Sequence, residues 1–264
     1  MTRLVLVLCG ALAGGLISAI ALVPSWRHAA LHALPPRAYV ALGALRGGFT
    51  TDHSVSIGMP DGTTLAGSLY LPRDLSKPLA TVLVRSPYGR LDYVESYEAG
   101  IFFARHGYAV LVQDLRGTGD SQGELLPWRD AESDGAATLD WIVQQSWSNG
   151  RVGTFGCSAL GETQLVLAKR NHPAHAAMIP SGAGGAIGSL GGSHGYFGLF
   201  EGGVFQLASG VGWFSTHGAK SPHRGRRVSF DVPATLRRLP VADLVRAVRA
   251  EPTGYDDFLA TPLG

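Results

Sequence analysis

The sequence predicts an α/β fold with a mainly parallel sheet, and two observations support that prediction. Between residues 80 and 180, short β-branched runs alternate with stretches of helical spacing, which is typical of strands joined by crossover helices. Apolar residues make up 45% of the 264 residues and the formal net charge is only +2. This composition excludes a disordered chain, and two cysteines cannot hold a chain of this length together without a packed core.

A long uncharged segment opens the chain. Residues 4–23 contain no charged side chain, and Pro24 ends the run. A spanning helix needs about 20 apolar residues, whereas a cleaved signal uses roughly 7–15. We therefore expect residues 1–27 to form a hydrophobic helix that is a membrane anchor or a signal peptide, so that the protein is membrane-anchored or exported. The small residues Ala19 and Ala21 leave cleavage open, and the charge bias does not fix the side.

The rest of the chain divides into three predicted parts. Residues 28–50 are expected to be a linker, because Pro35-Pro36 and Gly47-Gly48 interrupt them. Residues 51–181 carry the strand and helix alternation of the α/β core. Its expected elements are a hairpin around residues 60–62, strands at 80–86, 108–114, 151–156 and 176–180, and helices at 92–106, 130–146 and 159–171. Residues 182–264 are Gly-rich and then helical with Pro breaks, which predicts a separate helical cap region.

The stretch Gly156-Cys157-Ser158-Ala159-Leu160-Gly161 is the best candidate for a reactive site. It lies between a predicted strand and a predicted helix, the context of a nucleophile elbow. A tight turn there holds the serine clear of the sheet, and the helix N-terminus favours negative charge developing beside it. The spacing is G-x-S-x-x-G and not the commoner G-x-S-x-G, so the pattern alone also fits an ordinary turn.

Four blocks in order resemble the cocaine esterase / Xaa-Pro dipeptidyl-peptidase family of α/β-hydrolases. They are Asp61-Gly62-Thr63, Arg85-Ser86-Pro87-Tyr88, YAVLVQDLRGTGDSQGE and DWIVQQSWSNGRVGTFGCSALGETQ. The resemblance implies the N-terminal part of an α/β-hydrolase core, with Ser158 as the catalytic nucleophile. It also implies an oxyanion hole formed by the Tyr88 hydroxyl and the backbone N–H of Ala159. The family usually has tyrosine at the position of Ala159, but a main-chain donor does not depend on the side chain.

The acid and the histidine of the triad are not found. In this fold both follow the serine in the chain, and no residue after Ser158 matches either of them. Weaker candidates are His172 and His175, expected to point away from the serine, His194, His217 and His223, expected to be solvated or loop residues of the cap, and the turn acids Asp256 and Asp257. We therefore expect a C-terminally truncated hydrolase with little or no turnover. The alternative is a non-catalytic, membrane-tethered binding protein or a degenerate remnant of such an enzyme.

Other binding functions find little support. The glycines of residues 182–188 are spaced G-x-G-x-x-x-G, which differs from a dinucleotide loop, and no His, Cys or carboxylate spacing predicts a metal site. We expect no cofactor. The small net charge also argues against nucleic acid. The resemblance implies a small-molecule ester or peptide as the substrate, cleaved through an acyl-serine, while Asp114 or Arg116 is expected to brace a loop beside the site.

Overall fold

The computed structural model describes residues 34–126, 128–184, 188–190, 193–195, 199–201, 204–220, 229–248 and 252–260. Its centre is a six-stranded sheet with the strand order β1-β2-β4-β3-β5-β6. The strands are β1 (Phe49–Gly58), β2 (Thr64–Pro72), β3 (Leu79–Ser86), β4 (Ala109–Asp114), β5 (Ser148–Cys157) and β6 (His175–Ser181). β2 pairs antiparallel with β1 and with β4, and the other three pairings are parallel. The predicted mainly parallel α/β sheet is confirmed.

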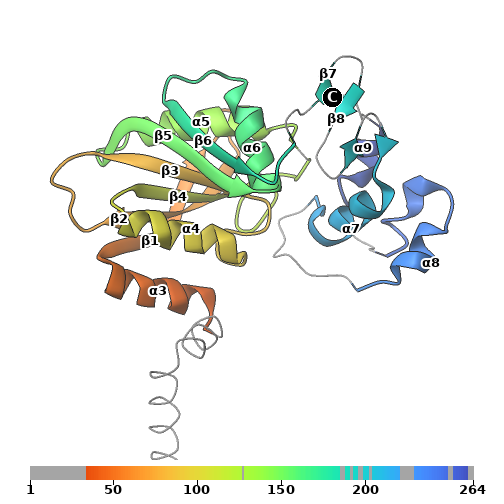
Figure 1. Ribbon diagram of the computed structural model, residues 1–264, viewed down its shortest axis with the longest axis horizontal. Coiled ribbons are helices and arrows are strands. Elements are labelled where there is room, and N and C mark those ends of the chain that lie inside the picture. The colour runs from red at the N-terminus through yellow and green to blue at the C-terminus, as the bar shows by residue number, and fades with distance from the viewer. Residues whose placement is uncertain are drawn as a thin grey trace, which may run out of the picture.

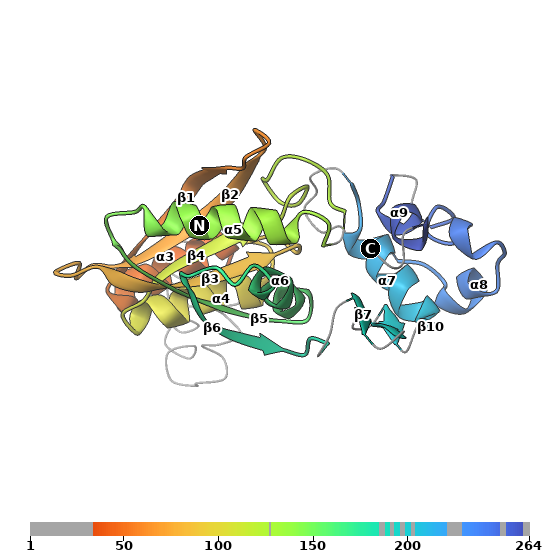
Figure 2. The same ribbon diagram turned by 90° about the horizontal axis from the view of Figure 1, so that it is seen from above.

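Helices cover both faces of the sheet. α3 (Pro36–Gly47) and α4 (Val94–Arg105) lie on one face, and α5 (Ala131–Val143) and α6 (Ala159–Ala168) lie on the other (Figures 1 and 2). Every residue of β4 is therefore buried, which explains why its sequence is a nearly continuous apolar run. Gly107, with φ 85°, follows the C-cap residue His106 of α4, a position where glycine adopts the left-handed conformation without strain.

The N-terminal predictions have two outcomes. Where the sequence predicted a linker at residues 28–50, the structure has α3, which packs against α4 and buries Val40 completely. The prediction was wrong because Pro36 occupies the first turn of α3. Backbone N–H groups in that turn have no intrahelical acceptor, so a proline there costs no hydrogen bond and is suited to start the helix. The hydrophobic helix expected at residues 1–27 lies outside the described residues. Among the helices that the structure does describe, none has the length and apolar character needed to cross a membrane.

The cap region has an apolar core of its own beyond the end of the sheet (Figure 1). Its helices are α7 (Leu207–His217), α8 (Val232–Leu236) and α9 (Tyr255–Ala260), with a 3-10 turn at Val241–Asp243. It also contains two short antiparallel strand pairs, β7 (Gly188–Leu190) with β8 (Ser193–Gly195), and β9 (Phe200–Glu201) with β10 (Val204–Phe205). Among the described residues, the glycine-rich beginning of the cap thus forms short strands, since glycine is poorly suited to a helix interior.

Candidate active site

Ser158 occupies a sharp turn between β5 and α6. Its backbone has φ 58° and ψ −127°, a conformation that a non-glycine residue adopts only where the surroundings enforce it. The Ser158 N–H donates to the carbonyl of Ser181 at 2.9 Å. A Cβ on Gly156 would lie 2.4 Å from the Cβ of Leu160. The strand and the helix therefore approach more closely than any residue other than glycine would permit at position 156. The turn therefore has the geometry of the predicted nucleophile elbow.

Tyr88 reaches Ser158 from the loop that follows β3. Its N–H donates to the hydroxyl of Ser86 at 3.1 Å, which fixes the loop. The Tyr88 side chain interacts with the side chain of Ser158 and with the backbone of Ala159. Burial raises the pKa of Tyr88, so its phenol keeps the proton at neutral pH and can donate it. The structure thus brings together all three residues that the sequence singled out.

A carboxylate supports the turn from the α4 side. Glu95 accepts a hydrogen bond from the N–H of Cys157 at 2.9 Å and another from the Tyr93 hydroxyl at 3.1 Å. Burial, reinforced by the charge of Glu95, raises the pKa of Tyr93 to about 12. The ring of Tyr93 packs against that of Tyr88 with the centroids 4.9 Å apart. Sequence reasoning missed Glu95, because an acidic residue in the first turn of a helix is common for electrostatic reasons alone.

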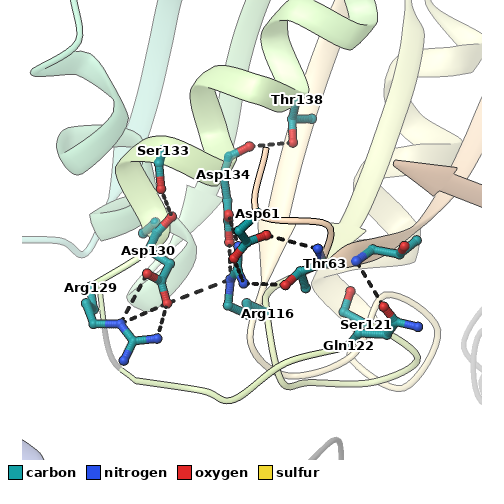
Figure 3. Close-up of polar contacts among 12 residues, drawn as sticks. Asp61, Thr63, Arg116, Ser121, Gln122, Arg129, Asp130, Ser133, Asp134 and Thr138 are labelled. Carbon is teal, nitrogen blue, oxygen red and sulfur yellow. Dashed lines mark hydrogen bonds and ion pairs between the residues drawn. The ribbon is translucent and has the colours of Figure 1, made fainter. Parts of the chain in front are cut away.

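Arg116 anchors the long loop between β4 and α5 (Figure 3). Its guanidinium donates to both carboxylate oxygens of Asp134, at 3.0 and 2.6 Å, and to Asp61 at 2.6 Å. At the start of the same loop, Asp114 accepts from the backbone N–H groups of Arg90 at 2.5 Å and Asp120 at 3.1 Å. The predicted bracing of this loop is confirmed for both Asp114 and Arg116.

The cap contacts the site through α7. The indole N–H of Trp213 donates to the Tyr88 hydroxyl at 3.3 Å, and the ring of His217 packs edge-on against Tyr88 with the centroids 4.7 Å apart. A second contact joins the N–H of Leu125 to the carbonyl of Lys220 at 3.1 Å. His217 is half-buried in this contact, so the expectation that it is a solvated loop residue was wrong. No local pattern marks these residues, which come together only when the cap packs on the core.

The other candidates for the base and the acid have partners elsewhere. His172 bonds to Asp140 at 3.1 Å, and His175 bonds to Thr154 at 2.9 Å. Asp256 pairs with Arg246 at 2.5 Å, and Asp257 pairs with Lys220 at 2.6 Å. The side chain of His194 and the whole of His223 lie outside the described part of the chain. Within that part, no histidine is hydrogen-bonded to the Ser158 hydroxyl, and no group of three or more potential ligands could hold a metal ion.

The sheet order and the turn at Ser158 define the class of the protein, which is that of the α/β-hydrolases. Residues 61–253 match the sequence profile of the X-Pro dipeptidyl-peptidase (S15) family, and the chain belongs to that family. This agrees with the family resemblance of the four sequence blocks.

Individual relatives agree with this assignment. The chain is 41% identical over 138 residues to a cocaine esterase of Rhodococcus sp. (strain MB1 Bresler), covering 51% of this chain and 24% of that protein. It thus spans about a quarter of the length of this relative. Among solved structures, an α-amino acid ester hydrolase is similar with a TM-score of 0.58 and 26% identity, over 76% of this chain and 35% of its own. An aminopeptidase from a marine sediment archaeon (Thaumarchaeota archaeon) shares the fold, with a TM-score of 0.60 and 24% identity over 81% of this chain and 38% of its own.

Proposed function

We propose that this chain supplies the nucleophile and the oxyanion hole of a hydrolase that cleaves esters or Xaa-Pro-type amides by acyl transfer. The Ser158 oxygen attacks the substrate carbonyl, and the negative charge that develops on the carbonyl oxygen is stabilised by the Tyr88 hydroxyl and the Ala159 N–H. Loss of the alcohol or amine leaves an acyl-serine, which water then hydrolyses. The observation that carries the proposal is the turn at Ser158, with φ 58°, beside a Tyr88 hydroxyl that interacts with the Ser158 side chain and the Ala159 backbone.

We further propose that the chain by itself turns over slowly. A serine is a weak nucleophile until a neighbouring base removes its proton. Among the described residues, the histidines whose hydrogen bonds are defined, at positions 53, 106, 172 and 175, each bond to a group other than Ser158. Removing the histidine of a serine hydrolase lowers kcat by about 10⁶. Rapid attack by Ser158 would then depend on a general base that those four histidines do not supply.

Labelling by a fluorophosphonate probe tests both parts of this proposal. We expect the purified 264-residue chain to be labelled slowly at Ser158, and added imidazole to accelerate labelling by replacing the missing base. Ser158→Ala should abolish labelling, whereas Ser133→Ala, which removes an exposed serine of α5, should not change it. Rapid labelling without imidazole would contradict slow turnover. Absence of labelling in both conditions would contradict the nucleophile and favour a non-catalytic binding protein.

The substrate class is tested with two chromogenic compounds. The 41% identical relative is named as an esterase, which favours an ester over an amide. We therefore expect imidazole-supported release of p-nitrophenol from p-nitrophenyl acetate, measured as the difference between the parent chain and Ser158→Ala. Release of p-nitroaniline from an Xaa-Pro anilide at a similar or higher rate would instead assign the site to a peptidase.

A further inference from the structure

The contact between Trp213 and Tyr88 is unusual in joining two parts of the chain that are 125 residues apart. The indole N–H donates at 3.3 Å to the same phenol oxygen that faces Ser158. An indole nitrogen in tryptophan can only donate a hydrogen bond. The direction of this bond is therefore fixed, and the Tyr88 oxygen is the acceptor.

The remaining neighbours of the Tyr88 oxygen determine where its proton points. Trp213 therefore uses one of the two lone pairs of the phenol oxygen. The Ser158 hydroxyl, which also interacts with the Tyr88 side chain, can accept the single phenol proton. With the indole N–H on one lone pair, the Tyr88 proton is directed away from Trp213 and is available on the side of the nucleophile, where the oxyanion forms in the proposed reaction.

Packing holds the indole in place. The Trp213 ring meets Phe214 edge-on with the centroids 5.1 Å apart, and the rings of Trp128 and His217 lie at 6.5 and 6.1 Å. Because the hydrogen bond is made by a side chain that is fixed on several sides, little reorganisation is needed when charge develops at the site. An accepted hydrogen bond also polarises the phenol O–H and makes it a stronger donor.

We propose that Trp213 is a positioning residue for the oxyanion hole, which it completes by fixing the Tyr88 hydroxyl with its proton directed at the reacting carbonyl oxygen. This role rests on the proposed function of Ser158. Because Trp213 lies on α7, full stabilisation of the transition state would require that α7 is docked on the core. The cap would then contribute to the chemistry and not only to the shape of the pocket.

The test uses Trp213→Phe, which keeps an aromatic ring but removes the N–H. In the imidazole-supported labelling assay, we expect it to slow labelling of Ser158 about 3- to 10-fold, the range for loss of one neutral hydrogen bond. In a Tyr88→Phe background the same substitution should have no further effect, because its target is gone. Trp141→Phe is the matched control, since Trp141 lies on α5 and packs against Trp147 in an apolar cluster that does not include Tyr88.

A spectroscopic measurement tests the contact without requiring activity. The indole ¹H–¹⁵N resonance of Trp213, assigned by its loss in Trp213→Phe, should move upfield in Tyr88→Phe, while that of Trp141 should not move. Equal slowing by Trp213→Phe in both backgrounds, no slowing at all, or an unmoved Trp213 resonance would overturn the positioning role while leaving the proposed function intact. A parent chain whose Ser158 is never labelled refutes the proposed function, and this role with it.

Discussion

Replacing Asp134, the buried ion-pair partner of Arg116, would show how much this pair contributes to the stability of the protein. Arg116 contacts two carboxylates, and they differ in burial: the Asp134 side chain is 2% exposed and the Asp61 side chain is 55% exposed. Removing one partner of a buried ion pair costs about 3–5 kcal/mol, because the other charge is left without compensation. Asp134→Asn keeps one acceptor oxygen, so we expect the lower end of that range, about 3 kcal/mol.

The assay is thermal unfolding followed by circular dichroism at neutral pH. For a chain of this size, 1 kcal/mol shifts Tm by about 2–4 °C, so Asp134→Asn should lower Tm by roughly 6–12 °C. Asp61→Asn is the matched control on the same guanidinium, and it should lower Tm far less because surface pairs contribute little. Added salt should reduce the Asp61 effect more than the Asp134 effect. An Asp61→Asn variant as unstable as Asp134→Asn would refute the reasoning from burial.

Three further perturbations follow from the site. Tyr88→Phe should slow imidazole-supported labelling of Ser158 by about 10²–10³, the usual loss for one oxyanion donor, and an unchanged rate would remove Tyr88 from that role. Gly156→Ala should lower the free energy of unfolding in urea by at least about 1–3 kcal/mol, since φ is 148° and a Cβ would meet Leu160 at 2.4 Å. Gly58→Ala, where no atom lies within 4 Å of a Cβ, is the control, and equal stability of the two variants would contradict the clash. The hydrogen bond from Arg116 lowers the pKa of Asp61 from 3.8 to about 2. The stabilisation of the fold by this ion pair is therefore fully present above pH 3.8 and is lost as the pH falls through about 2. The stability difference between the parent and Asp61→Asn should vanish over that window, and a difference that persists below it would point to another cause.

The sequence was sufficient for the features that depend on neighbouring residues. The alternation of apolar runs and helical spacing predicted the sheet and its crossover helices. The string from Gly156 to Gly161 predicted the turn at Ser158, because a strand-to-helix elbow leaves its signature within six residues. The family resemblance added Tyr88, which lies on a different strand end and has no local signature. The structure places it beside Ser158 and Ala159 as that resemblance implied.

Features that depend on distant contacts could not be predicted in the same way. Trp213 and His217 face Tyr88 only because α7 packs on the core, and neither a tryptophan nor a histidine in a glycine-rich segment identifies its partner. α3 was missed for a different reason. Its first residue, Pro36, follows another proline, and such a pair indicates a break as readily as the start of a helix.

The free side of β6 has a consequence for where a general base could enter. β6 ends the strand order, pairs in parallel with β5, and exposes Met178 and Ile179 among the described residues. Ser181, at its carboxyl end, is in register with Cys157, the residue before the nucleophile. A further parallel strand added to β6, whether from this polypeptide or another, would finish level with Ser158. The register of this one strand pair thus sets the carboxyl end of the outermost strand level with the nucleophile turn.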